Sequence, residues 1–354
     1  MEPHAPPAPA VPLVSVVVLN YNGARWLARC LDSLRAQTIA GRLEVIVADN
    51  LSTDGSDRFA AEWVRGWSAA QFIQHGRNLG YCAGNNAAAA VARGEFLFFL
   101  NNDAWLEPGC LEVLVDETRR AGASASCPLV MNYDDGTFQS LGAFGYDLFG
   151  LVTSRLACDA TREVLMPEGC AYLVERAAFV ELGGFDPEFF MYADEFDLSW
   201  RLWVTGRRAV AVPRARLHHR GAAQVNPEGG GQVVELRTSD TKRFYANRNS
   251  LLVLLKGARG PLLALAASQV LLLAVEALAA LVLVRRVAFV RRAYLGALAD
   301  CWRLRGHVAA ERRRLRPLRR RGDLAMLRFL RARPNRWDEL LRMRQLGLPK
   351  VTAK

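Results

Sequence analysis

The stretch Glu95-Phe96-Leu97-Phe98-Phe99-Leu100 runs directly into the polar triplet Asn101-Asn102-Asp103. The apolar run predicts a strand that is buried on both faces, as in a parallel sheet covered by helices. Ligands of such sheets bind beyond the carboxyl ends of the strands, which is where this triplet would lie. A carboxylate at that point can hold a divalent cation against a diphosphate. The stretch is therefore a first sign of an enzyme that uses a nucleotide-sugar.

Two earlier strands are predicted to end in the same way. Leu13 to Leu19 is apolar and β-branched and stops at Asn20, and Leu43 to Ala48 stops at Asp49-Asn50. Between these strands, helices are predicted at residues 24–37, 58–70 and 80–93, and a short strand is predicted at residues 71–74. Strands that alternate with helices predict an α/β fold with a mainly parallel sheet flanked by helices. Because three of the four strands end in Asn or Asp, we expect these side chains to share one pocket.

The pattern loosens beyond Val130, where glycines at positions 142, 145 and 150 indicate loops or hairpins. A helix is predicted from Glu195 to Thr205, and a short strand is predicted from Ala209 to Val212. We expect the pocket shape around residues 141–151 and 167–173 to determine which sugar and which acceptor are used.

The composition excludes two broad classes of protein. Hydrophobic residues make up 51% of the 354, too many for a disordered chain and too few for a polytopic membrane protein. The net charge of +11 is concentrated near the C-terminus, because thirteen arginines lie between residues 285 and 321 against only Asp300 and Glu311. The seven cysteines are scattered without CxxC spacing, which predicts neither a zinc site nor a disulfide framework and favours a reducing cytosol.

The N-terminal segment from Met1 to Pro12 is rich in Pro and Ala. It lacks the basic and apolar regions of a signal peptide, so we expect a short disordered lead. The main domain is then expected to cover residues 13–250, and a helical region, apolar and then rich in arginine, is expected to cover residues 251–354.

Between Val14 and about Asn249, about two-thirds of the chain resembles glycosyltransferase family 2, the inverting enzymes of the GT-A fold. The resemblance rests on an ordered set of motifs: Val16 to Gly23, Ala48 to Ser56, Asn78-Leu79-Gly80, Gly84-Asn85-Asn86, Leu100 to Asp103, Gly183 to Asp186, Tyr192 to Leu198 and His218-His219. Within the family, the chain is most similar to the bacterial rhamnosyltransferase-like branch. The resemblance implies an enzyme that moves a sugar, with rhamnose as one candidate, from a nucleotide-diphosphate donor to a cell-surface glycan or a lipid-linked acceptor.

The resemblance also implies the residues that bind the donor. Asp49 would accept hydrogen bonds from the nucleobase or the ribose, and Asn20 would line the same nucleotide pocket. Asn78 and Asn85 would hold the diphosphate or the sugar, and Asn102 would belong to the same nucleotide-sugar site.

A metal site and a catalytic base are implied as well. Asp103 matches the last position of the family's Asp-x-Asp motif for Mg²⁺ or Mn²⁺, although its first position here is Asn101. His219, with His218 as the alternative, matches a distal histidine that some members use as a further ligand. Asp194 and Glu195 match the acidic pair that supplies the base, and our hypothesis is that Glu195 is the base, with Asp194 as the alternative.

Several of these residues also have a purely structural interpretation. Asn and Asp after a strand often cap the next helix, and we expect Asp54 to fix the loop that follows it. Asp197 is expected to cap its helix or to pair with Arg201 rather than to take part in catalysis. The two histidines would then form a strand end without a ligand role.

The apolar segment from Pro261 to Val284 is long enough to span a bilayer, but Glu276 would lie in the hydrocarbon. We therefore expect a helix in the membrane interface or a half-buried hairpin, with the following arginines facing an anionic cytoplasmic leaflet. The enzyme would then be cytoplasmic and peripheral at the inner face of the cell membrane. A helical packing region or a homo-oligomer contact is the alternative, and nucleic acid is not expected as a partner.

Two rival functions stay open at this stage. A non-catalytic scaffold would keep the fold and bind a nucleotide-sugar, and the missing carboxylate at Asn101 is in its favour. The acidic pair at Asp194 and Glu195 argues against a scaffold. A nucleotidyltransferase would need a phosphate loop rich in glycine and lysine after the first strand, and Asn20 to Gly23 is not such a loop.

Overall fold

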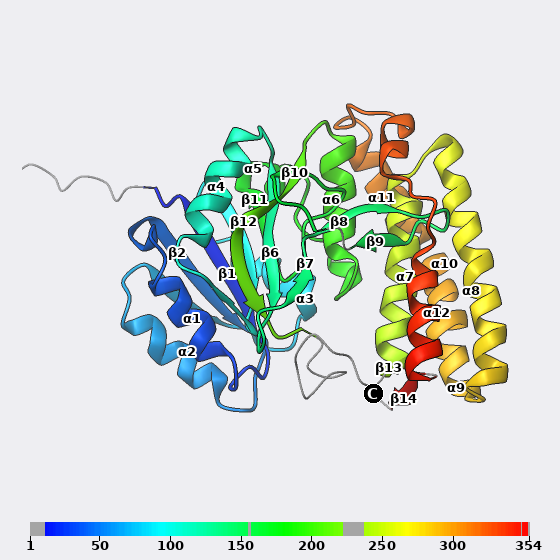
Figure 1. The fold of residues 1–354 in the computed structure, drawn as a ribbon, viewed down its shortest axis with the longest axis horizontal. Helices are drawn as coiled ribbons and strands as arrows, with labels where there is room; N and C mark the ends of the chain where they lie inside the picture. Colours follow the sequence, from blue (N-terminus) through cyan, green and yellow to red (C-terminus); the bar gives the residue numbers. More distant parts are fainter. Residues whose placement is uncertain (1–10, 155–156, 222–236, 348, 353–354) are drawn as a thin grey trace, which may run out of the picture.

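The computed structural model describes residues 11–154, 157–221, 237–347 and 349–352, and Figure 1 shows the arrangement of these parts. Except for Val11 and Pro12, the lead predicted for residues 1–12 lies outside this described part. The helices are α1 (Leu27–Arg35), α2 (Ser56–Arg65), α3 (Gly80–Ala89), α4 (Cys110–Arg120), α5 (Arg176–Glu181), α6 (Asp194–Val204), α7 (Asp240–Gly257), α8 (Leu263–Leu283), α9 (Val287–Val290), α10 (Ala297–Arg303), α11 (Arg305–Leu315) and α12 (Asn335–Leu346).

The strands of the main sheet are β1 (Val14–Asn20), β2 (Leu43–Asp49), β3 (Ala70–Gln74), β4 (Phe96–Asn101), β5 (Ala104–Leu106), β6 (Ala125–Asn132), β7 (Phe138–Ser140), β10 (Arg162–Glu163), β11 (Ala171–Glu175) and β12 (Ala209–His219). Their main path runs β10-β12-β6-β11-β4-β1-β2-β3, with β5 beside β12 and β7 beside β6. The central strands are parallel except for β11, which pairs antiparallel with β4 and β6. The predicted α/β fold with a mainly parallel sheet is therefore confirmed.

Register brings the polar strand ends together. Asn20 of β1 pairs with Asp49 of β2, and Leu19 pairs with Asn101 of β4. Because all three strands are parallel, their carboxyl ends share one edge of the sheet. The strand predicted from Ala209 continues to His219 as β12, past an irregularity between Val212 and Arg216, and so reaches the same edge.

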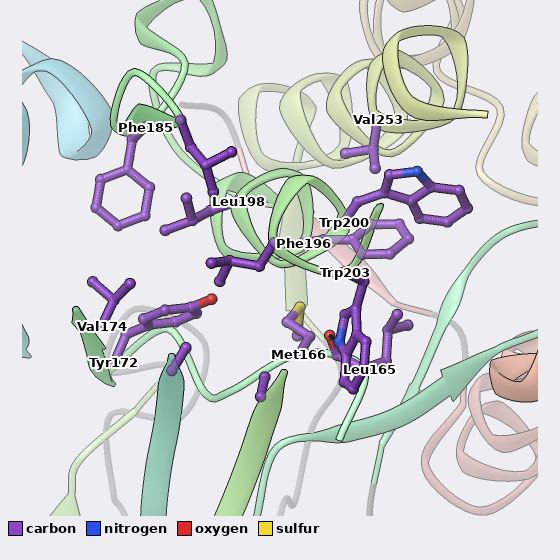
Figure 2. Close-up of a cluster of buried hydrophobic side chains, with 14 of the residues drawn as sticks. Leu165, Met166, Tyr172, Val174, Phe185, Phe196, Leu198, Trp200, Trp203 and Val253 are labelled. Carbon is purple, nitrogen blue, oxygen red and sulfur yellow. Dashed lines mark hydrogen bonds between the residues drawn. The ribbon is translucent and has the colours of Figure 1, made fainter. Parts of the chain in front are cut away.

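The alternating side chains of the central strands fill two cores. Val16, Val45 and Phe98 pack with α1, α2 and α4 on one face of the sheet, whereas Val17 and Phe99 pack toward α3, α5 and α6 on the other. Figure 2 shows the second core around α6, where the rings of Phe196 and Trp200 lie together and Trp200 extends beside Val253 of α7. Burying large apolar side chains of this kind contributes roughly 1.5–3 kcal/mol each.

The C-terminal helices form a layer beyond α6 (Figure 1). The predicted domain boundary at residue 250 falls inside α7, which contacts α6 on one side and α8, α10 and α11 on the other. Two small sheets complete the described chain, formed by β8 (Ala143–Tyr146) with β9 (Val152–Ser154) and by β13 (Arg237–Ser239) with β14 (Lys350–Thr352). The C-terminal region is helical, as predicted.

Candidate functional site

Three strand ends meet in one hydrogen-bonded network. The Asn20 amide donates to the Asp49 carboxylate at 2.7 Å and to the Ser56 hydroxyl at 2.8 Å. The Asn102 amide donates in turn to the Asn20 side-chain oxygen at 2.8 Å. The ends of β1, β2 and β4 are thus joined, and the three residues predicted to bind the nucleotide-sugar there lie together.

Gly23 allows this network to close. A Cβ atom at position 23 would lie 2.2 Å from the Asn102 Nδ2 and 2.4 Å from the Asn20 Oδ1, closer than real Cβ contacts. Any larger residue would therefore push Asn20 and Asn102 apart. The Asn-Tyr-Asn-Gly turn after β1 thus serves the packing of this edge.

The carboxylate of Asp49 is fully buried and already has several protein donors. Besides Asn20, it accepts hydrogen bonds from the Ser52 amide and hydroxyl and from the Gln74 side chain, at 2.6–2.9 Å. A direct contact with a nucleobase would have to replace one of these donors. In this structure Asp49 orders the loop that follows β2.

The structure separates the two residues predicted to hold the diphosphate or the sugar. Asn78 is exposed before α3, where its side-chain oxygen accepts the Gly80 amide at 2.8 Å. Asn85 is buried within α3 and donates to the Tyr81 carbonyl at 3.0 Å. Asn78 is therefore available to a ligand, whereas Asn85 serves the helix.

Asp103 and His219 face each other across this edge. The Asp103 Oδ1 and the His219 Nε2 are 3.3 Å apart, and the Asn101 amide lies 3.4 Å from the same nitrogen. Burial by itself would raise the pKa of Asp103, but the hydrogen bond and the charge of His219 lower it. Burial would lower the pKa of His219, but contacts with Cys170 and Asp103 raise it well above its ordinary value.

Gln139 of β7 sets the orientation of the His219 ring. Its amide nitrogen donates to the Asn132 side chain and to the His219 carbonyl, so its oxygen faces the His219 Nδ1 at 2.8 Å. The Nδ1 must then carry a hydrogen, so the Nε2, which faces Asp103 at 3.3 Å, is the nitrogen that a metal ion would take once its proton is lost. Metal-binding histidines are commonly oriented by such a partner. Sequence reasoning missed Gln139, because the β7 hairpin that brings it here has no clear pattern.

The other histidine of the pair points elsewhere. His218 stacks on Trp105 with 3.9 Å between the ring centroids, and its Nε2 lies 3.0 Å from the Glu107 carboxylate. Only His219 of the two thus reaches Asp103.

Asp103 and His219 supply one oxygen and one nitrogen donor, a set that suits a divalent transition metal. Among the residues that the structure describes, no group of three or more His, Cys, Asp or Glu side chains is arranged to hold a metal ion. The donor set fits a cation that takes its remaining ligands from a diphosphate and water, as Mg²⁺ does in many phosphate sites.

The acidic pair lies at the start of α6, and the backbone that precedes it is strained. Phe190, Tyr192 and Ala193 have φ angles of 61°, 70° and 59°, in the left-handed region that non-glycine residues rarely adopt. Each such residue costs on the order of 1–3 kcal/mol and persists only where the surrounding structure holds it. The carboxyl groups of Asp194 and Glu195 are thus placed by a segment that neighbouring parts must stabilise.

The environment of these two carboxyl groups favours their protonated forms. Burial raises the pKa of Glu195 to about 7, and the charge of Glu168 acts in the same direction. Burial and the adjacent Glu195 raise the pKa of Asp194 well above its ordinary value. The pair is therefore held against full ionisation, and the pKa of Glu195 lies close to neutral pH. A carboxylate with a pKa near the working pH is suited to act as a general base.

The short segment before β11 links the two pairs. The Glu195 carboxyl lies against Gly169, where a Cβ atom would be 3.2 Å from its Cδ. The next residue, Cys170, contacts His219 through its side chain. The Cys170 carbonyl accepts a hydrogen bond from the backbone amide of Asn101 at 3.0 Å. Gly169 thus lies against the acidic pair, and Cys170 contacts the Asp103–His219 pair.

Two residues have the structural roles expected for them. Asp54 accepts the backbone amides of Ala24 and Ser56, at 2.9 and 3.1 Å, and so fixes the loop before α2. Asp197 pairs with Arg201 at 2.7 Å inside α6 and with Lys256 of α7 at 2.8 Å.

A family model described as "Glycosyl transferase family 2" matches residues 15–181. The chain is 32% identical over 235 residues to the Myxococcus xanthus "O-antigen biosynthesis protein RfbC", which covers 62% of this chain and 18% of that protein. It is 28% identical over 267 residues to a Mycobacterium tuberculosis "N-acetylglucosaminyl-diphospho-decaprenol L-rhamnosyltransferase", which covers 67% of this chain and 85% of that protein. The chain thus spans less than a fifth of the Myxococcus relative and most of the mycobacterial one.

Solved structures share the fold. S. aureus TarS 1-349 in complex with UDP-GlcNAc superposes with a TM-score of 0.56 at 16% identity, covering 86% of this chain and 90% of that one. The mannosyltransferase PcManGT from Pyrobaculum calidifontis, in complex with GDP-Man and Mn²⁺, gives 0.51 at 18% identity and covers 91% of this chain and 88% of that one. At these identities the likeness concerns the fold.

Proposed function

We propose that the chain, whose residues 15–181 match the model of glycosyltransferase family 2, transfers a sugar with inversion from a nucleotide-diphosphate donor to a hydroxyl of a surface glycan or a lipid-linked acceptor. The observation that carries this proposal is the carboxyl pair beside residues 169–170, because burial brings the pKa of Glu195 to about 7. A pair of this kind has no evident purpose in a protein that only binds.

The proposed chemistry is a single displacement. Glu195 takes the proton of the acceptor hydroxyl, whose oxygen then forms a bond to the anomeric carbon of the donor sugar. The bond from that carbon to the diphosphate oxygen breaks, and its electron pair stays on the diphosphate. Burial and the neighbouring Glu195 raise the pKa of Asp194, so the pocket resists a second negative charge beside the base. Asn20, Asn102 and the loop ordered by Asp49 bind the nucleotide at the opposite side.

Asp103 and His219 are the residues that would hold the metal ion. A bound Mg²⁺ or Mn²⁺ supplies Lewis-acid stabilisation of the charge on the leaving diphosphate. The imidazole ligand favours Mn²⁺, since imidazole suits transition metals better than Mg²⁺. Asn101 replaces a carboxylate, so we expect the cation to bind tightly only when the diphosphate supplies further oxygens.

The donor and the acceptor are the finer part of the proposal. The mycobacterial relative is named for transfer of L-rhamnose to a sugar on a diphospho-lipid. We therefore take an activated deoxysugar such as rhamnose as the first donor to test, and a sugar linked to a polyprenyl diphosphate as the first acceptor.

We also propose that the enzyme works at the cytoplasmic face of the membrane. Among the described residues, one helical stretch, Gly260–Leu283, is long and apolar enough to cross a bilayer, and a third of its most apolar part is buried in the protein. Its outer face exposes a continuous apolar stripe of 40–67% exposed side chains: Val270, Leu271, Val275, Leu278 and Val282. Glu276 is neutralised by Arg336 of α12 at 2.5 Å, so it does not oppose contact with lipid.

Arginines lie beyond both ends of α8. Arg285 and Arg286 follow the C-terminal end of α8, and a hollow of about 370 Å³ next to its N-terminal end is lined by Arg259, Arg312, Arg313 and Arg316. Each basic residue near an anionic leaflet contributes about 1 kcal/mol to binding. A helix that lies in the interface plane fits this arrangement better than one that spans the bilayer.

Vesicle sedimentation tests the membrane part. Binding to vesicles with anionic lipid, weaker for zwitterionic vesicles, should be lost in Leu271→Glu. Phe59→Glu is the control, because Phe59 is 40% exposed and belongs to α2, which lies at the opposite end of the molecule from α8 (Figure 1). Equal binding by both variants would remove α8 from the contact, and a concentration-dependent dimer held by the stripe would favour the oligomer instead.

Nucleotide release tests the transferase proposal. UDP-, dTDP- and GDP-sugars would be incubated with Mn²⁺, Mg²⁺ or EDTA, with and without a polyprenyl-diphosphate sugar. Release that needs metal and acceptor from one donor supports the proposal and identifies the donor. The scaffold alternative is favoured by Asn101, which replaces a carboxylate. A scaffold would bind the donor in a calorimetric titration but would release no nucleotide under any of these conditions.

A further inference from the structure

We propose that Asn249 of α7 is a positioning residue for the reaction, which holds the strained segment before Asp194 and Glu195 in its working conformation. The inference rests on the proposed role of Glu195 as the base. It assigns to α7 a part in catalysis that none of the quoted motifs contains.

The Asn249 side chain, which has no exposed surface, is surrounded by the carbonyl groups of that segment. Its amide nitrogen lies 2.9 Å from the Phe189 oxygen, 2.8 Å from the Met191 oxygen and 2.8 Å from the Tyr192 oxygen. A left-handed backbone turns successive carbonyls to unusual directions, and these three converge on one donor group. The same amide therefore stabilises the conformation that Phe190, Tyr192 and Ala193 would otherwise avoid.

Arg248 fixes the orientation of the Asn249 amide. Its Nε donates to the Asn249 side-chain oxygen at 2.8 Å, which turns the amide nitrogen toward the segment. Another of its nitrogens donates to the Glu188 and Phe189 carbonyls. Asp300 of α10 accepts the remaining arm of the guanidinium at 2.8 Å. The interactions thus run from α10 through Arg248 and Asn249 to the segment that carries the base.

The opposite side of the segment is held by α3. The Phe190 carbonyl accepts the backbone amide of Tyr81 at 2.6 Å and that of Cys82 at 3.2 Å. The Phe190 ring stacks on Tyr245 of α7 with 5.4 Å between centroids, and it covers Gly80, where a Cβ atom would lie 2.4 Å from the ring. With α3 attached to the sheet, α7 is the side that a single substitution can loosen.

The test compares two isosteric substitutions on the same helix. Asn249→Asp keeps the volume and the bond from Arg248 but removes donation to the segment. Asn247→Asp is the matched control, because Asn247 is also buried and donates at 2.9 Å to the Ala293 carbonyl, which belongs to the C-terminal helices. Both variants are expected to lose similar thermal stability, so a general packing defect is measured by the control.

Kinetics should separate the two variants. Misplacement of a catalytic group by about 1 Å can lower turnover on the order of 100-fold. We expect Asn249→Asp to lower kcat 10- to 100-fold with the donor KM unchanged. The acidic limb of the kcat/KM profile should also move to lower pH, because water that reaches Glu195 lowers its pKa. Asn247→Asp should stay within about threefold of wild type at an unchanged limb. Equal losses in both variants, with no shift of the limb, would overturn the inference.

A measurement without turnover keeps the inference separate from the proposed function. Hydrogen exchange over residues 186–198 should speed up at least tenfold in Asn249→Asp and stay unchanged in Asn247→Asp. If the wild type were inactive with every donor, the proposed function would fail while this comparison could still be made. If Asn249→Asp did not fold, Asp300→Asn should show the same changes at a smaller size, and unchanged exchange in that variant would contradict the proposal.

Discussion

Two pairs of partly or fully buried ionisable groups, one at the edge of the sheet and one at the start of α6, have environments that act in opposite directions. Around Asp103 and His219, hydrogen bonding favours the charged carboxylate and the charged imidazole. Around Asp194 and Glu195, burial favours the neutral acids. Environments that drive pKa values apart distinguish catalytic roles. The first pair is suited to hold a cation and a diphosphate, and the second to exchange a proton.

The two pairs also differ in how the chain builds them. Asp103 follows β4 directly and His219 ends β12, so strand pairing alone brings them to one edge. Glu195 begins a helix after a strained segment, and α3 and α7 hold that segment from two sides. The Asp103–His219 pair, called the metal pair below, is thus positioned by strand pairing. The acidic pair instead depends on helices that are far apart in the sequence.

The largest effect is expected at Glu195. Glu195→Gln should lower the transfer rate on the order of 10²–10⁴-fold, because an amide cannot take the proton of the acceptor hydroxyl. Donor binding, measured by calorimetry, should stay unchanged. Asp194→Asn should lose only about tenfold, since an amide at position 194 can still donate to Glu195.

Glu188→Gln is the control for this experiment. Glu188 lies seven residues earlier in the chain and its side chain is exposed, so the variant should retain full activity. Undiminished turnover in Glu195→Gln, with a large loss in Asp194→Asn, would exchange the roles of the two carboxyl groups.

The next effect concerns the metal pair. Asp103→Asn should lower turnover about 10- to 100-fold and raise the Mn²⁺ concentration needed for half activity, because it removes the carboxylate ligand. Asn101→Asp should lower that concentration, since it adds a second carboxylate beside the His219 Nε2. Titration of activity with Mn²⁺ in both variants measures the change. A Mn²⁺ requirement that neither substitution moves would place the cation elsewhere.

Much of the metal and nucleotide side could be predicted from sequence. An apolar run that ends in Asn or Asp predicts a buried strand and places the polar side chain at the end of that strand. Asn20, Asp49 and Asp103 all follow such runs. The parallel register then brings them together without further information. Sequence could not show that Asn85 is used inside α3, because helix contacts decide that.

The support of the acidic pair could not be predicted in this way. Nothing in the residue types near Tyr192 shows a left-handed backbone, since glycine is absent there. Asn249 lies more than fifty residues later, and its contacts depend on how α7 crosses α6. The contact of Gln139 with His219 could not be predicted either, because it depends on where a short hairpin lies. The sequence pattern therefore does not determine contacts made by long-range packing.

A smaller effect is expected from pH. Glu195 must be ionised to take a proton, so kcat/KM should fall tenfold per unit as the pH drops below its pKa of about 7. A rate measured at pH 6 should then be about a tenth of the plateau value. Saturating Mn²⁺ in every assay separates this limb from metal loss. A profile that stays flat down to pH 5 would mean that the base has an ordinary carboxyl pKa and that the two pairs do not differ as described.

The smallest effect is on stability, and its sign follows from the same pKa. Glu195 has a higher pKa in the folded protein than in the unfolded chain, so the unfolded chain loses its proton first as the pH rises. Between about pH 4.5 and 7 the folded state therefore loses stability, by 1.36 kcal/mol for each unit of pKa difference at most. Glu195→Gln carries no such charge and should be more stable than wild type at pH 8, by about 1–3 kcal/mol, and nearly equal at pH 4.5. Urea unfolding at the two pH values measures the difference, with Glu188→Gln expected to follow wild type at both. A Glu195→Gln protein that gained nothing at pH 8 would show that the acidic pair is not held against its ionisation, and the contrast with the metal pair would then rest on geometry alone.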